Sequence, residues 1–211
     1  KSIQNRSMEF SLLISFPAAV GLYLLAEPII SILFERGAFS SVDTYYSSRV
    51  LSLFSLGLPA YILIKVLNPS FFAREDTKTP FYITLFCVVL NVILSLLLID
   101  PFREMGIALA TALSSWVNVL ILYVVLKRRD HITPDQRLKT NFVKILCAAL
   151  VMLFGTLLFR NMFLTELMSS NSLINALLLL ANIFFALIIF AYMVFVLKIY
   201  SIDEIRKHLK K

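Results

Sequence analysis

One lysine, Lys65, lies inside a long apolar stretch, and two polar side chains share its helical face. Tyr61, Lys65 and Asn68 are spaced i, i+4 and i+7, which places them on one side of a helix. A charge at membrane depth is costly and is by default the mark of a functional site. A cation beside a hydroxyl and an amide suits a cavity that receives an anionic or sugar-bearing group. These three residues are therefore the candidate substrate-binding set.

Two other interpretations of Lys65 stay open. The apolar stretch ends at Phe72, about 10 Å further along a helix that rises 1.5 Å per residue, so the lysine stem could reach the membrane surface. The same face could instead pair with a carboxylate on a helix that this sequence does not contain.

The remaining pattern predicts no enzyme, no metal site and no cofactor. No group of His, Cys, Asp and Glu has the spacing of metal ligands. Cys87 and Cys147 both fall inside apolar stretches, where thiols behave as small apolar side chains. The Ser-rich helical faces have no base at a helical spacing, so no nucleophilic triad can be built from nearby residues.

The composition predicts a membrane protein rather than a soluble domain. Of the 211 residues, 59% are hydrophobic and 16% are charged, against roughly 45–50% and about 25% in soluble domains. The mean hydropathy is +0.85. A soluble domain would have almost no surface with this composition, and a disordered chain is excluded. The fold class expected is all-α and polytopic.

Six apolar stretches are long enough, or nearly so, to cross a bilayer as helices. They cover residues 10–26, 50–72, 81–99, 106–126, 142–159 and 173–197. Pro28 and Gly37 predict a separate interfacial helix over 28–35. Thr79 with Pro80 predicts the start of the third span, and Asp100 with Pro101 its end. Residues 1–130 then hold four spans, and residues 131–211 hold two more and a tail with a short surface helix over 201–211.

The basic residues are unevenly distributed between the two predicted sides. With six spans, 15 of the 20 Lys and Arg fall on the side of the two chain ends, 4 fall on the opposite side, and Lys65 lies in a span. Positive charge accumulates on the cytoplasmic side, so both ends are predicted to be cytoplasmic. The net charge of +7 is then explained by topology, without a nucleic-acid partner. The first residue is Lys, not Met, and we expect the chain to be part of a longer protein.

Milder polar residues form stripes along several spans. Such stripes mark contacts between membrane helices or the lining of a cavity. The stripes comprise Ser48, Ser52, Ser55 and Pro59; Thr84, Asn91 and Ser95; Thr111, Ser114 and Asn118; and Asn175 with Asn182.

Two loop motifs resemble those of the MurJ/MviN family of lipid II flippases. Stretch 33–39 (LFERGAF), followed by Asp43 and Thr44, resembles the loop after the family's ninth span. Stretch 66–80 (VLNPSFFAREDTKTP) resembles its loop between spans ten and eleven, and 106–118 resembles the twelfth span. The motif residues are Glu35, Arg36, Gly37, Asp43, Arg74, Asp76, Thr77 and Pro80.

The resemblance implies a fold and an activity. This chain would be spans nine to fourteen of a fourteen-span exporter of the multidrug/oligosaccharidyl-lipid/polysaccharide superfamily. Such proteins move the undecaprenyl-diphosphate-linked peptidoglycan precursor from the cytoplasmic to the periplasmic leaflet of the bacterial inner membrane by alternating access. The last two spans would border a groove for the lipid tail, and Lys65 would face the cavity. Partners would be that precursor, membrane lipids and candidate cell-envelope synthesis proteins.

Three alternatives remain. The chain could belong to an exporter of another polyprenyl-linked sugar or of a drug in the same superfold, or to a non-transporting membrane scaffold subunit. A membrane-embedded transferase is disfavoured, because the sequence lacks acid/base clusters within the membrane.

Overall fold

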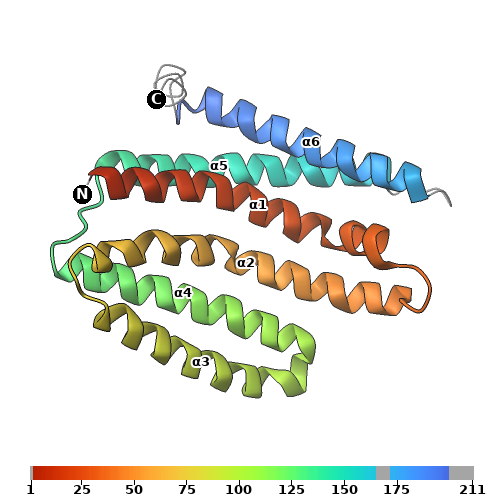
Figure 1. Cartoon of the computed structure of the whole chain (residues 1–211). Helices are drawn as coiled ribbons and strands as arrows, with labels where there is room; N and C mark the ends of the chain where they lie inside the picture. The colour runs from red at the N-terminus through yellow and green to blue at the C-terminus, as the bar shows by residue number, and fades with distance from the viewer. Residues whose placement is uncertain (1, 165–171, 200–211) are drawn as a thin grey trace.

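The computed structural model describes residues 2–164 and 172–199, and these form six long α-helices. The helices run side by side and alternate in direction (Figure 1). Their bounds are α1 Ser2–Phe34, α2 Ser41–Phe72, α3 Lys78–Phe102, α4 Glu104–Arg128, α5 Gln136–Phe159 and α6 Ser172–Val196, with a short π-helix at Arg160–Leu164. Each of the six is long and apolar enough to cross a membrane. The predicted tail over 201–211 lies outside the described residues.

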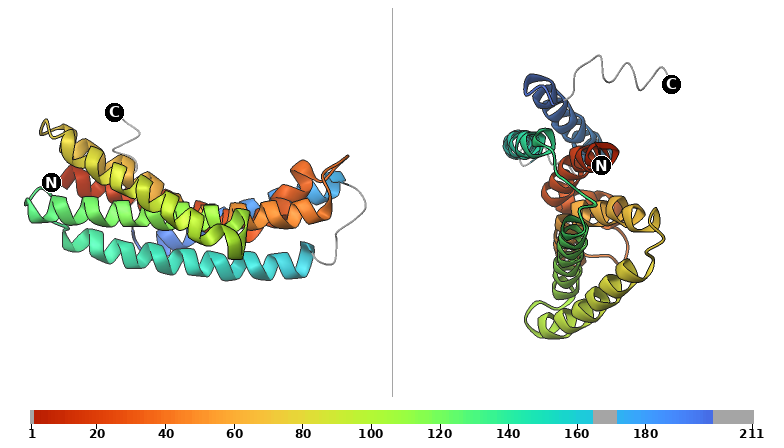
Figure 2. Two further views of the ribbon diagram at one scale, coloured as in Figure 1. Left: turned by 90° about the horizontal axis from the view of Figure 1, so that it is seen from below. Right: turned by 90° about the vertical axis from the view of Figure 1, so that its left-hand side faces the viewer.

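The order of the helices across the bundle positions the site. Viewed from its end, the bundle has α1 and α2 in the middle, α4 and α3 on one side, and α5 and α6 on the other (Figure 2, right). The main core lies where α1, α2, α4 and α5 meet and includes Leu12, Leu67, Phe71, Leu122 and Ile145. Beyond α4, helix α3 exposes a nearly continuous apolar surface, as expected for a face toward lipid.

Three predicted helix boundaries differ from the structure. No separate helix covers 28–35, because α1 continues through Pro28 to Phe34, with its last turns out of line with the rest (Figure 1). Likewise α3 continues through Asp100 and Pro101 and ends at Phe102, followed by Arg103 with φ 51° as its C-cap. Proline is tolerated inside membrane helices, because neighbouring groups bind the freed carbonyls. Thr79 does not cap α3; its backbone N–H lies in the first turn and donates to Asp76 Oδ1 at 3.0 Å.

The corner between α1 and α2 explains several residues of the first motif. Gly37 has φ 63°, a left-handed conformation that glycine adopts without strain. Ser40 and Asp43 form a capping box at the start of α2, in which each side chain accepts a hydrogen bond from the other residue's backbone N–H. The Thr44 hydroxyl donates to Glu35 Oε2 at 3.0 Å, which closes the turn. This motif therefore sets the geometry of a tight interhelical connection.

Side-chain hydrogen bonds from several residues of the polar stripes join neighbouring helices. Asn91 Nδ2 of α3 donates to Thr111 Oγ1 and Ser114 Oγ of α4, both at 3.1 Å. Ser52 Oγ of α2 lies 3.3 Å from the Tyr23 carbonyl oxygen of α1. For these residues the helix-contact interpretation of the stripes is confirmed.

Helices α2 and α4 approach closely at Gly57. A Cβ atom there would lie 3.1 Å from the Ala112 Cα and would also clash with the Tyr61 ring. Next to this contact, Trp116 Nε1 donates to the Leu56 carbonyl oxygen at 3.0 Å. These contacts fix α2 against α4 just before Pro59, at the start of the segment that carries Lys65.

Candidate functional site

The three residues predicted to contact substrate lie along one face of α2. Lys65 is exposed, while Tyr61 and Asn68 are half-buried. Among the described residues, no carboxylate forms an ion pair with Lys65. The Tyr61 hydroxyl is buried beside Ser115 of α4, and Asn68 Oδ1 is buried without a hydrogen-bond partner within the described part of the chain. The face therefore presents the Lys65 cation, whereas the Tyr61 hydroxyl and Asn68 Oδ1 lie buried within the bundle.

The second motif builds a contact between the α2–α3 loop and the end of α4. Asp76 accepts hydrogen bonds from the Thr79 backbone N–H and from Arg129 Nη1, and Arg129 Nη2 donates to Thr79 Oγ1 at 3.1 Å. Thr77 precedes the first residue of α3, and Pro80 is buried in its first turn. Arg36 and Arg74 are exposed, and Arg74 Nη1 donates to the Ser70 carbonyl of its own helix. The motif residues of both loops thus shape connections and do not gather at one site.

The Asp76 contact gives a pH prediction. Hydrogen bonds from Thr79 and the neighbouring Arg129 lower the pKa of Asp76 to about 2. Because the folded pKa lies below the ordinary value of about 3.9, the stabilisation is full above that value and is lost as the pH falls toward about 2. We expect Asp76→Asn to lower the midpoint of thermal unfolding at neutral pH, and this deficit to shrink between about pH 4 and about pH 2. Asp130→Asn, at an exposed carboxylate near the same loop, is the matched control; a deficit independent of pH would contradict the assignment.

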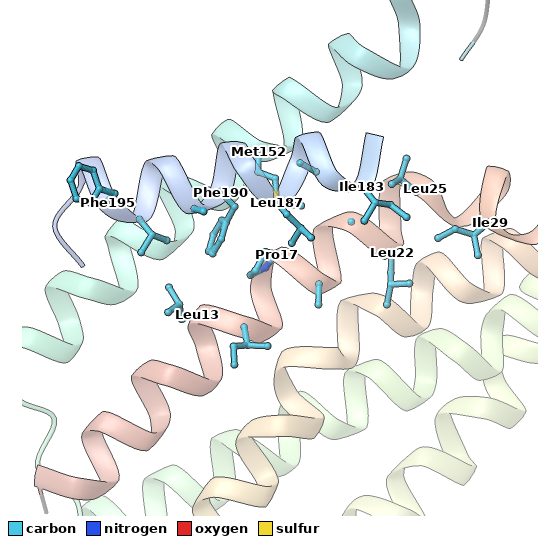
Figure 3. A pocket seen from close by; sticks show the side chains of 16 residues that line it. Leu13, Pro17, Leu22, Leu25, Ile29, Met152, Ile183, Leu187, Phe190 and Phe195 are labelled. Carbon is cyan, nitrogen blue, oxygen red and sulfur yellow. The ribbon is translucent and has the colours of Figure 1, made fainter. Parts of the chain in front are cut away.

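A wholly apolar groove lies on the other side of the bundle, between α1 and α6, with α5 behind it. Its volume is about 750 Å³. Figure 3 shows side chains of α1 and α6 facing each other across it, with Met152 of α5 between them. All 16 lining residues are apolar: Leu13, Ile14, Pro17, Ala18, Gly21, Leu22, Leu25, Ile29, Met152, Ile183, Ala186, Leu187, Phe190, Ala191, Val194 and Phe195. A groove of this kind can bind an aliphatic chain and has nothing to offer a charged group.

Helix α1 forms one wall of the groove, which sequence reasoning did not anticipate. The resemblance pointed only to the last two spans, 142–159 and 173–197. In an apolar stretch without polar residues, the sequence does not indicate which face of the helix packs against other helices and which stays open. The role of α1 in the groove could therefore not be predicted.

A charged cluster lies at the end of the groove nearest Asn5. We call Arg6, Glu9, Asp135, Arg137 and Asn141 the Glu9 cluster. Glu9 is fully buried; it forms an ion pair with Arg6, accepts a hydrogen bond from Asn141 Nδ2 at 2.5 Å, and lies 3.8 Å from Arg137 Nε. Arg6 also pairs with Asp135.

Asp135 caps α5 within this cluster by accepting from the Leu138 backbone N–H at 2.9 Å. Burial raises the pKa of Asp135, but the Leu138 hydrogen bond and the charge of Arg6 together hold that pKa below its usual range. Glu9 was not predicted as a functional residue, because residues 1–9 are polar and precede the first apolar stretch. The i, i+3 spacing of Arg6 and Glu9 could have indicated an ion pair on a helix.

At the opposite end, Arg160 contacts α1. Its Nη1 donates to the Leu24 carbonyl oxygen at 3.2 Å. Pro28, four residues after Leu24, has no backbone N–H, so that carbonyl lacks its helical donor. The sequence gives no sign of this contact, because Arg160 is more than a hundred residues from Leu24. No group of three or more His, Cys, Asp and Glu that could hold a metal is found among residues 2–164 and 172–199.

Comparisons with known proteins agree on one family. The family model for lipid II flippase MurJ matches residues 1–178. A relative from Rhizobium tropici, named probable lipid II flippase MurJ, is 46% identical over 151 residues, which are 72% of this chain and 28% of the relative. One of the same name from Rickettsia prowazekii (strain Madrid E) is 37% identical over 179 residues, 85% of this chain and 35% of the relative.

A solved structure of lipid II flippase MurJ in an inward closed conformation has a similar fold. The TM-score is 0.73 at 30% sequence identity, over 90% of this chain and 38% of that one. The chain therefore spans about a third of the length of the relatives it matches.

Proposed function

The chain belongs to the MurJ lipid II flippase family, and we propose that it forms the part of such a flippase that holds the lipid tail and one side of the headgroup cavity. A polyprenyl diphosphate-linked sugar has a charged head and a long aliphatic tail. The observation that carries the proposal is that one bundle presents both an apolar groove of about 750 Å³ and, on a different face, an exposed membrane-embedded lysine.

The head and the tail then travel by different routes. The diphosphate and sugars lie in a cavity bordered by the α2 face that carries Lys65, Tyr61 and Asn68, and the tail stays in the groove between α1 and α6. Two lobes rock so that the cavity opens to one leaflet and then to the other. Lys65 supplies charge to the anion, and the half-buried side chains of Tyr61 and Asn68 flank it on the same helical face.

The orientation in a bacterial inner membrane follows from charge. Asn5 Nδ2 donates to the Thr133 carbonyl oxygen at 3.0 Å, so the start of α1 and the α4–α5 segment lie at the same end of the bundle. Arg74, Lys78, Lys127, Arg128, Arg129 and Arg137 lie in or next to the connections at that end, whereas Arg36, Arg49, Arg103 and Arg160 lie toward the other. We assign the richer end, with both ends of the chain, to the cytoplasm.

The test is to replace the host flippase by the complete protein that contains this chain. In a bacterium depleted of its own lipid II flippase, this protein should restore lipid II to the outer leaflet. Lys65→Ala should lower the export rate by about tenfold, the effect of losing one hydrogen bond to a charged group. Lys65→Arg should retain most of it. Lys144→Ala, at a half-buried lysine of α5, is the matched control and should export normally.

The possible outcomes test the substrate assignment and the role of Lys65 separately. If a well-inserted parent leaves lipid II inside, lipid II is not its cargo, and another polyprenyl-linked sugar becomes the substrate to test. If the parent exports and Lys65→Ala exports equally well, Lys65 reaches the membrane surface and does not contact the head.

A further inference from the structure

Two sets of polar contacts join α1 to α5, one toward each end of the groove. The Glu9 cluster lies one helical turn before Leu13, the first lining residue, and the Arg160–Leu24 hydrogen bond lies beside Leu25, near the last lining residues of α1. All groove-lining contacts between these ends are apolar. One polar contact therefore lies just before the first lining residue of α1, and the other lies near the far end of the groove.

At the first end, one amide connects three helices. Asn141 Nδ2 of α5 donates to Glu9 Oε1 of α1. It also lies 3.3 Å from the carbonyl oxygen of Ile199, a residue just after the end of α6. Asn141 is 4% exposed and Glu9 is 0% exposed. In this dry setting the two bonds fix the ends of α1, α5 and α6 relative to one another.

At the second end, the backbone itself provides the acceptor. Pro28 deprives the Leu24 carbonyl of its helical partner, and the guanidinium of Arg160, the first residue after α5, takes that place. One turn before Leu24, Gly21 of α1 faces Met152 of α5, since a Cβ added at Gly21 would lie 3.7 Å from the Met152 Cε. The two helices thus also approach each other between the two polar contacts.

We propose that Asn141 and Arg160 are positioning residues that hold the groove open at a fixed width and length for a long lipid tail. This inference rests on the proposed function of the groove. In lipid, apolar helices gain no hydrophobic free energy by touching each other, so packing and polar contacts decide their arrangement. Without the two contacts, α1 and α6 would close onto each other, and the tail would have to reopen the groove. A preformed groove removes that cost from binding.

The test compares two probes with the same head and different tails. Undecaprenyl diphosphate is long enough to occupy the whole groove, whereas farnesyl diphosphate occupies only part of it. Binding of each is measured to the complete protein in detergent micelles, for the parent and for Arg160→Met, Arg160→Lys and Asn141→Ala. Asn141→Ala leaves Glu9 paired with Arg6, so it creates no unpaired buried charge. Arg103→Met, in the turn between α3 and α4 and away from the groove, is the matched control.

We expect Arg160→Met and Asn141→Ala each to weaken undecaprenyl diphosphate binding by about 3- to 10-fold, the effect of losing one hydrogen bond. Farnesyl diphosphate binding should hardly change, and Arg160→Lys should restore most of the long-tail affinity because it keeps a donor for the Leu24 carbonyl. Equal losses for both probes would mean that the residues only maintain the fold, and no loss for either would mean that they do not position the groove; both results overturn the inference. If the parent itself binds both probes equally, the groove does not hold the tail, and the proposed function of the groove fails with it.

Discussion

Replacing Ala18 by Trp should nearly abolish export of the lipid-linked precursor. Ala18 is exposed and lines the groove from α1, so a larger side chain there projects into the groove without overpacking the core. The displaced tail returns to the bilayer and not to water. The binding free energy that is lost therefore comes from packing contacts and not from the hydrophobic effect. A few tens of atom contacts at about 0.1–0.2 kcal/mol each amount to ~2–4 kcal/mol. Export should therefore fall by about 30-fold or more.

The opposite wall offers an independent version of the same test. Ala191 of α6 is also exposed and lines the groove, so Ala191→Trp should reproduce the loss. Ala181, on the same helix, is exposed but does not line the groove, and Ala181→Trp serves as the control. Lipid II in the outer leaflet is measured for all three. Equal export by Ala18→Trp and Ala181→Trp would show that the groove is not on the transport route.

Replacing Arg6 by Met should destabilise the folded protein by about 2–3 kcal/mol. The change leaves the fully buried Glu9 carboxylate with Asn141 and a more distant Arg137. Breaking a fully buried pair by removing one partner costs about 3–5 kcal/mol. The loss should be smaller here, because the Arg6 side chain is 33% exposed and water already screens it. The free energy of unfolding is measured by denaturant titration in mixed micelles.

A second substitution identifies the cause of that loss. Glu9→Gln removes the buried charge and keeps an acceptor for Asn141, so the Arg6→Met, Glu9→Gln double variant should recover more than half of the lost stability. Lys139→Met, at an exposed basic residue of the first turn of α5, is the control for removing positive charge from this end. A double variant no more stable than Arg6→Met would mean that an uncompensated Glu9 charge is not the source of the instability.

The sequence was sufficient to predict the helical bundle. Six apolar stretches stand out because a bilayer requires roughly 20 apolar residues of helix, and each corresponds to one of the helices α1 to α6. Asn91, Thr111 and Ser114 could be assigned to helix contacts, because polar atoms within a membrane need partners. These signals are local, and they depend on residue type and spacing alone.

The groove and its polar ends could not be predicted in the same way. Whether Leu13 or Leu187 is packed or faces an open groove depends on helices that are distant in sequence. Arg160 finds its acceptor only because Pro28, more than a hundred residues earlier, frees a carbonyl that three-dimensional packing brings beside it. Glu9 is buried because α5 and the segment before it fold over α1. Such contacts carry no periodicity in the sequence.

The most direct test of the central claim is to locate the lipid tail. The complete protein in membrane vesicles is labelled with an undecaprenyl diphosphate that carries a photoreactive group in its tail, and the labelled residues are mapped. We expect the labels to concentrate on α1 and α6 at groove residues such as Ile14, Leu22, Leu187 and Phe195. The exposed apolar face of α3, at residues such as Leu96 and Leu97, reports labelling from bulk lipid. Labelling of α3 as strong as that of the groove would contradict the claim that this chain holds the tail of a lipid-linked substrate.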